Sequence, residues 1–97
     1  MDIPEIPLIP QPETDAARNA LGFKWAGSEV GTRHKLGGTP EWIQGDDSPL
    51  CPACQQPMTF YGQLDSIGDA VNLADCGMIY VFVCFDCYEC QAILQSY

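Results

Sequence analysis

The sequence MIYVFVCFDC at 78–87 joins an apolar run to two cysteines separated by two residues, and a second C-x2-C pair, CPAC, lies at 51–54. Each pair can present two thiolates on one tight turn, and four thiolates can enclose a tetrahedral metal ion. The 29 residues between the pairs exceed the usual spacer of a zinc ribbon, and a hairpin with a long connection accounts for the difference. We therefore predict one structural zinc ion (Zn2+) with four ligands: Cys51, Cys54, Cys84 and Cys87.

The sequence leaves open the roles of two further cysteines and an alternative chemistry, which is a redox-active pair of thiols. Cys90 forms a third pair in CFDCYEC and could replace Cys84 or Cys87, but Cys84 ends the apolar run much as Cys54 leads toward the opposing strand. Cys76 follows an aspartate in a polar connection and is expected to be a small buried side chain. A redox pair needs a βαβ setting with a helix N-terminus to lower the thiol pKa, and the sequence shows none. In a reducing compartment, closely spaced cysteines bind metal more often than they form disulfides.

The segments around the cysteine pairs predict a small antiparallel sheet. MTFYGQLDS at 58–66, IYVFVC at 79–84 and QAILQSY at 91–97 are apolar or alternating and contain many aromatic and β-branched residues, which is typical of strands. The polar connection at 66–77 favours turns, and the turn-rich segment 23–50 is expected to hold short irregular strands. The predicted fold class is mainly β, with zinc-ribbon knuckles, by which we mean the tight turns that carry the two cysteine pairs.

The N-terminal residues 1–13 contain four prolines, which fix φ and remove backbone donors, so we expect an extended Pro-rich arm. This arm either covers its own domain or binds a partner. TDAARNALG at 14–22 predicts a short helix that Thr14 caps and Gly22 ends. A chain of 97 residues has room for one small core. We therefore predict a single zinc-ribbon β domain at 14–97.

The charge of the chain is strongly one-sided. Four lysines and arginines face 13 aspartates and glutamates, so the formal net charge is −9, and residues 36–97 contain eight carboxylates and no lysine or arginine. Direct nucleic-acid binding is disfavoured, because affinity for phosphate depends on cationic side chains. A surface of this sign suits a basic protein partner. The acidic residues predicted to bind that partner are Asp46, Asp47, Asp65, Asp69, Asp75, Asp86 and Glu89.

Neither a membrane location nor a catalytic site is indicated. The first residues lack the basic and apolar regions of a secretory signal, and the longest apolar run, MIYVFVC, is far shorter than a membrane span, so a cytoplasmic location without membrane contact is expected. His34 is the only histidine and is expected to be an exposed turn residue rather than a ligand or general base. Ser66 is expected to bond to Asp65 within a turn, and no nucleophile motif surrounds them. We predict that the protein is not an enzyme.

Several separated motifs resemble the YwqG-like family of small β-rich domains, specifically its zinc-bearing branch. The resemblance covers about two-thirds of the chain and includes HKLGGTPEWIQ, CPACQQPMTFYGQLDS, DCGMIYVFVCFDC and the final QSY. A similar Gly-Gly-x-Pro-x-Trp and cysteine layout occurs in the programmed-cell-death family of ribosomal-protein chaperones. The positions that carry the resemblance besides the cysteines are Gly37, Gly38, Pro40, Trp42, Phe60, Gln63, Asp75, Gly77, Tyr80 and Phe82.

The resemblance implies an interaction function, and it carries over no catalytic residue. YwqG-like domains include proposed immunity proteins that neutralise bacterial toxins, and the chaperone relatives hold a basic ribosomal protein. Our first hypothesis is therefore an immunity protein that masks a basic partner such as a toxin nuclease. The alternatives are a chaperone or docking module for a basic nucleic-acid-binding or ribosomal protein, and a zinc- or thiol-dependent enzyme.

Overall fold

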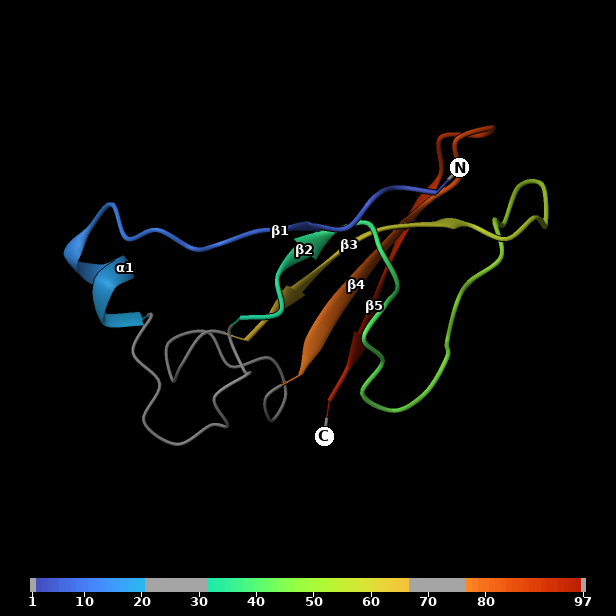
Figure 1. Cartoon of the computed structure of the whole chain (residues 1–97). Helices are drawn as coiled ribbons and strands as arrows, with labels where there is room; N and C mark the ends of the chain where they lie inside the picture. The colour runs from blue at the N-terminus through green and yellow to red at the C-terminus, as the bar shows by residue number, and fades with distance from the viewer. Residues whose placement is uncertain (1, 21–31, 67–76, 97) are drawn as a thin grey trace.

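The computed structural model describes residues 2–20, 32–66 and 77–96, and their regular elements form one sheet and one short helix (Figure 1). The five strands of this part of the chain follow one another in the sheet in sequence order, and every neighbouring pair is antiparallel. The prediction of a mainly β fold with one short helix is confirmed. The elements are β1 (Ile6–Pro7), α1 (Asp15–Ala20), β2 (Lys35–Leu36), β3 (Thr59–Asp65), β4 (Met78–Val83) and β5 (Cys90–Gln95).

The core lies on one face of the sheet, and β4 explains its position. Alternate side chains of a strand point to opposite faces, so Met78, Tyr80 and Phe82 are buried together while the residues between them stay half-buried. Trp42 packs on this face, with ring centroids 4.5 Å from Tyr80 and 5.8 Å from Phe82. Phe60 of β3 completes the aromatic group, with its ring centroid 5.5 Å from that of Phe82. These rings anchor β3, which follows the first cysteine pair, and β4, which leads into the second.

The N-terminal segment joins the sheet through backbone hydrogen bonds. Its strand β1 pairs with β2, and the Gly38 N–H donates to the Ile3 carbonyl at 2.8 Å. Gly37 has a φ of +66°, and a Cβ there would collide with the backbone carbonyls of Ile3 and Pro4, so only glycine fits this crossing. The proposed boundary between an arm and a domain stays a prediction.

The helix α1 begins as the sequence predicts. The Thr14 hydroxyl accepts a hydrogen bond from the Ala17 N–H at 3.0 Å, which is the bond expected of an N-cap. Asp15 and Arg18 form an exposed ion pair one turn apart. The predicted stop at Gly22 lies outside the described residues. At six residues, α1 is far too short to cross a bilayer, and no other helix of the described ranges could do so.

Candidate metal centre

The turns that carry the two C-x2-C pairs lie at the same end of the sheet (Figure 1), and their four cysteines come together there. Their sulfur atoms all lie within 4.8 Å of one another. The first pair lies on a turn between Leu50 and Pro57, which form an antiparallel bridge, and the second lies on the turn between β4 and β5. Antiparallel pairing closes each turn at its base, so the sheet and the bridge together position all four sulfurs.

The two turns have the same backbone hydrogen bonds. In the first turn, the Gln55 N–H donates to the Cys51 carbonyl and the Cys51 N–H donates to the Gln56 carbonyl, both at 2.8 Å. The second turn repeats both bonds 33 positions later: the Tyr88 N–H donates to the Cys84 carbonyl at 2.7 Å, and the Cys84 N–H donates to the Glu89 carbonyl at 2.8 Å. Each turn therefore presents its two thiols in the same way, and the two pairs approach each other as equivalent halves of one site.

The residue after the second cysteine of each turn has a left-handed backbone. The φ angle is +63° at Gln55 and +57° at Tyr88. Residues with a Cβ rarely adopt this conformation, which costs about 1–2 kcal/mol. Each turn therefore contains a strained residue directly after its second cysteine, and this feature was not predicted from the sequence. Glycine, the usual marker of such a position, is absent from both.

The same correspondence explains where Cys90 lies. Cys90 pairs with Val83 at the base of the second turn, as Pro57 pairs with Leu50 at the base of the first. Its position is that of a strand residue, its side chain is exposed, and it is not part of the four-cysteine group. The structure therefore brings together the four cysteines predicted as ligands and leaves out Cys90. Cys76 lies outside the described residues.

The spacing of the sulfurs suits a tetrahedral metal ion. With metal–sulfur bonds of about 2.3 Å, the sulfurs of an ideal tetrahedron lie about 3.8 Å apart. The sulfurs of Cys54 and Cys84 are 3.7 Å apart, which matches this edge and is far too long for a disulfide. Among the described residues the cysteines are free thiols, and four of them form a donor set typical of closed structural sites. The cluster can hold a metal ion.

The thiols influence one another's ionisation strongly. The backbone N–H of Cys54 donates to the Cys51 sulfur and lowers the Cys51 pKa to about 7. The neighbouring Cys54 sulfur, together with burial, raises the Cys87 pKa to about 12. The Gln56 N–H favours the Cys54 thiolate, yet burial and the adjacent sulfurs outweigh it and raise the Cys54 pKa. A cluster of this kind cannot carry four negative charges at neutral pH unless a cation compensates them.

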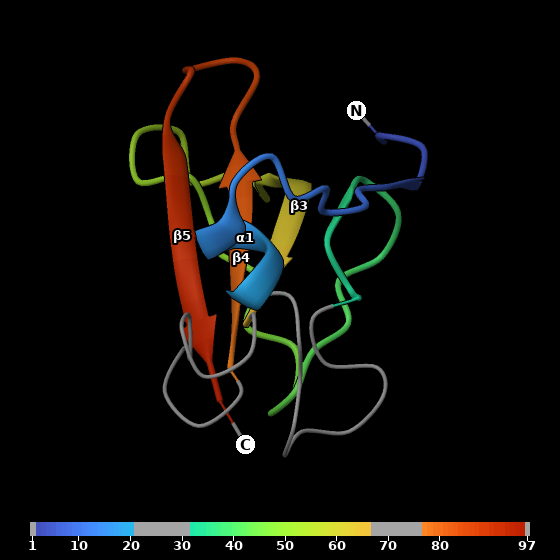
Figure 2. The same cartoon turned by 90° about the vertical axis from the view of Figure 1, so that its left-hand side faces the viewer.

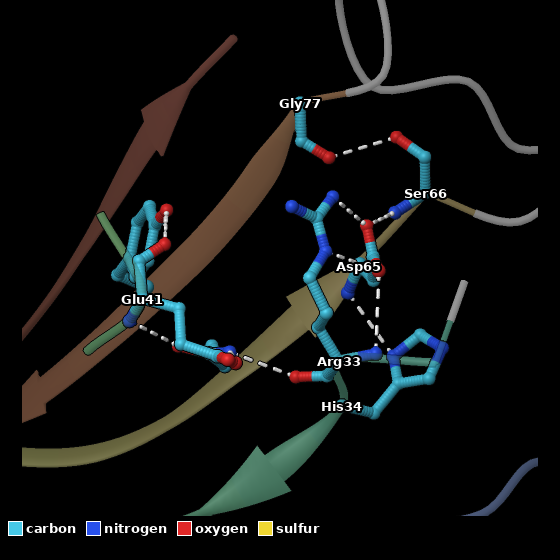
Figure 3. A network of polar contacts seen from close by, with 8 residues as sticks. Arg33, His34, Glu41, Asp65, Ser66 and Gly77 are labelled. Carbon is cyan, nitrogen blue, oxygen red and sulfur yellow. Dashed lines mark hydrogen bonds and ion pairs between the residues drawn. The ribbon is translucent and has the colours of Figure 1, made fainter. Parts of the chain in front are cut away.

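A second polar site lies at the other end of β3 and centres on an ion pair (Figure 3). The Arg33 guanidinium binds Asp65 in a bidentate manner, with Nε and Nη2 each 2.9 Å from a carboxylate oxygen. The Ser66 N–H donates to the same carboxylate at 2.8 Å. The Asp65 side chain is completely buried and that of Arg33 is 12% exposed, so this pair is part of the interior.

Two predictions about this region are wrong. His34 is buried rather than an exposed turn residue, and its Nδ1 accepts a hydrogen bond from the Asp65 N–H at 3.0 Å. Asp65, predicted to bind a partner, is buried against Arg33 because the strand directs it to the inner face. Ser66 bonds to Asp65 through its N–H, as expected, and its hydroxyl donates to the Gly77 carbonyl at 2.8 Å.

Buried side chains on β3 and β4 hold the loop that carries Trp42. The Gln63 amide nitrogen donates to the Arg33 carbonyl at 2.8 Å and to the Glu41 carboxylate at 2.6 Å. The Tyr80 hydroxyl donates to the Glu41 carbonyl at 2.7 Å, and burial raises the Tyr80 pKa. These contacts were not predicted from the sequence. A signal was present, because the alternation of side chains along each strand places Gln63 and Tyr80 on the buried face.

A buried glutamine at the end of β5 holds the following part of the same loop. The Gln95 amide oxygen accepts hydrogen bonds from the Ile43 and Gln44 N–H groups at 3.0 and 2.9 Å, and its nitrogen donates to the Gly45 carbonyl at 2.9 Å. The Gln44 side chain also donates to the Ser96 carbonyl at 2.5 Å. The loop that continues into Asp46 and Asp47 is thereby fixed beside the end of β5.

The remaining residues predicted to bind a partner fall into two groups. Asp46, Asp47, Asp86 and Glu89 are exposed. The Ser48 hydroxyl and then its N–H donate to the Asp46 carboxylate and lower the Asp46 pKa. The other two predicted residues, Asp69 and Asp75, lie outside the described residues.

Comparison with known proteins adds one relative. No family model matches the chain, and no solved structure matches it significantly. Over 66 residues, or 68% of its length, the chain is 41% identical to the uncharacterized protein YpfL of Salmonella typhimurium. The matched region spans 15% of YpfL. The chain is thus similar to a segment of a much longer protein, and this similarity identifies neither a partner nor a reaction.

Proposed function

We propose that the protein is a non-catalytic interaction domain, in which one structural zinc ion supports the fold and an anionic surface binds a basic protein. The observation that carries this proposal is the four-cysteine cluster on two equivalent turns. Four cysteine ligands fill a tetrahedral zinc site, which leaves no position for a substrate or an activated water. The ion would therefore tie the turn after β4 to the turn before β3 and supply stability to a small core.

The distribution of charge supports a basic partner. The described cations are engaged with carboxylates of the chain itself: Arg33 with Asp65, Lys35 with Glu5, and Arg18 with Asp15. The side chains of Arg33 and Lys35 are only 12% and 9% exposed. Exposed carboxylates are thus left to dominate the electrostatic potential, which favours encounter with a cationic surface.

The basic partner that we favour is a toxin nuclease, which makes the protein an immunity protein. A nuclease holds phosphates through cationic side chains, and an acidic domain that covers these side chains blocks the substrate. The resemblance to the zinc-bearing YwqG-like branch supports this choice. The resemblance of this chain to ribosomal-protein chaperones supports the alternative, which is a docking module for a basic ribosomal or nucleic-acid-binding protein. Such a module would use the same charge complementarity.

Metal analysis tests the structural part of the proposal. We expect one zinc ion per chain in purified protein, and thiols that do not react with a thiol reagent until the metal is removed. Cys51→Ser and Cys84→Ser should each lose the metal and much of the folded structure. Cys90→Ser is the matched control, because Cys90 lies outside the cluster, and it should keep both. Absence of bound metal, or metal loss in the Cys90→Ser protein alone, would refute the assignment.

Salt-dependent capture tests the interaction part. Zinc-loaded protein should recover a basic protein from lysate at low ionic strength and release it at high ionic strength. Purified partner should then bind more weakly to the Asp46→Lys/Asp47→Lys variant than to the Asp2→Lys/Glu13→Lys variant, which has the same net charge. Binding that is indifferent to salt, or equally reduced in both variants, would contradict a localised anionic binding surface.

A further inference from the structure

The two edges of the sheet differ in how they are protected against pairing with another chain. The edge strand β1 has two residues and contains Pro7, and prolines also stand at positions 4 and 10. Short length and proline are two common ways in which proteins block an edge. The other edge strand, β5, has six residues in continuous register with β4 and no proline. Within the described ranges, β4 is the only strand that pairs with β5 (Figure 2).

The edge strand β5 also lacks the charges that usually discourage strand addition. Its sequence CQAILQ and the following Ser-Tyr contain no charged residue in a chain of net charge −9. Cys90, Ala92 and Leu94 share one face of the strand and are exposed, Leu94 by 53%. The strand therefore offers both backbone hydrogen-bonding groups and an apolar surface to an added strand.

Exposed carboxylates lie at both ends of this neutral strand. Asp86 and Glu89 belong to the turn that immediately precedes β5. At the opposite end, the contacts of Gln95 with the loop place Asp46 and Asp47 next to the strand, because Gly45 accepts a hydrogen bond from the Gln95 amide. Six residues in a strand span about 20 Å, so the two acidic groups bracket a neutral edge of that length.

We propose that β5 binds an extended segment of a basic protein as a sixth strand of the sheet, with a neutral centre of about six residues and lysine or arginine at both ends. This inference rests on the proposed function and names the surface through which it operates. Backbone hydrogen bonds would supply affinity along the strand, and the flanking charges would set position and register. A second copy of the chain fits poorly, because antiparallel pairing of two β5 strands brings Glu89 of each copy to the Asp46–Asp47 end of the other.

The test uses two synthetic peptides of identical charge. The first is acetyl-KRTVTVTVRK-amide, and the second has the same sequence with every amide nitrogen of the six central residues methylated. Methylation removes the donors that a strand needs and keeps the four cations. We expect the unmethylated peptide to bind the zinc-loaded full chain at least tenfold more tightly in fluorescence anisotropy. Its binding should also slow hydrogen exchange of β5 amides.

A matched pair of protein variants locates the flanking contact. Glu89→Gln and Glu13→Gln each remove one exposed carboxylate, the first beside β5 and the second in the Pro-rich segment. We expect Glu89→Gln to weaken binding of the unmethylated peptide by about two- to fivefold relative to Glu13→Gln, the range typical of an exposed ion pair.

Each remaining outcome overturns a defined part of the reasoning. Equal binding of the two peptides refutes strand addition while leaving the attraction for basic partners intact. Failure of both peptides to bind at low salt refutes the anionic surface itself and the proposed function with it. A concentration-dependent dimer in sedimentation equilibrium that the unmethylated peptide dissociates would show that a second copy, and not a basic segment, occupies β5.

Discussion

Replacing Asp65 by asparagine should strongly destabilise the protein, because it removes one partner of the buried ion pair. The substitution preserves the size of the side chain but removes its negative charge. Arg33, whose side chain is 12% exposed, donates two guanidinium hydrogen bonds to this carboxylate and would lose its counter-charge. Breaking a buried pair from one side costs about 3–5 kcal/mol. We take the lower value, about 3 kcal/mol, because the asparagine amide can keep part of the hydrogen bonding.

The chain offers a matched control in its other arginine–aspartate pair. Asp15 and Arg18 are 2.8 Å apart, and their side chains are 95% and 65% exposed. The Asp15→Asn change should therefore cost well below 1 kcal/mol, as exposed pairs usually do. The same chemical substitution thus has two very different expected effects, and burial is what separates them.

Urea unfolding of the zinc-loaded proteins, followed by tryptophan fluorescence at pH 7, measures the difference. With an m-value of about 1.5 kcal/mol per molar, a loss of about 3 kcal/mol lowers the midpoint by about 2 M. The Asp15→Asn midpoint should stay within a few tenths of a molar of the parent. Equal midpoints for the two variants would refute the conclusion that the Arg33–Asp65 pair belongs to the interior.

Further predictions concern the turns, the metal and the N-terminal crossing. Gln55→Gly and Tyr88→Gly should each stabilise the metal-loaded fold by about 0.5–1 kcal/mol in urea unfolding. Glycine relieves about 1–2 kcal/mol of left-handed strain but loses about 0.5–1 kcal/mol more backbone entropy on folding. Destabilisation by both variants would contradict the turn geometry. Gly37→Ala should lower the thermal midpoint, since its new Cβ meets backbone carbonyls, and an unchanged midpoint would refute that packing. Acidification from pH 8 to 5 should release the metal, because protons compete with it for the sulfurs. The stability that the metal supplies is therefore present at the higher pH and lost as the pH falls. A zinc indicator would follow the release of the metal, and circular dichroism would follow the loss of folded structure.

Local features of the sequence were sufficient to predict the three longer strands and the donor set of the four-cysteine cluster. β3, β4 and β5 each alternate or run apolar, and their side-chain periodicity is independent of distant contacts. The spacing of each C-x2-C pair confines two sulfurs to one turn, so two such pairs already imply a four-sulfur site. The N-cap at Thr14 was predictable for the same reason, because capping involves only the first turn of a helix.

Contacts between distant residues were decided by the tertiary structure. Arg33 and Asp65 stand 32 positions apart, so the sequence showed an aspartate at a strand end but could not show that an arginine covers it. The burial of His34 has the same origin, because its Nδ1 contacts the backbone of β3 rather than its own neighbours. The number of charges is a property of composition, so the sequence by itself determined the sign of the surface charge. The exposure of each charge depends on the packing of the sheet. Only the fold therefore determined which carboxylates remain on the surface.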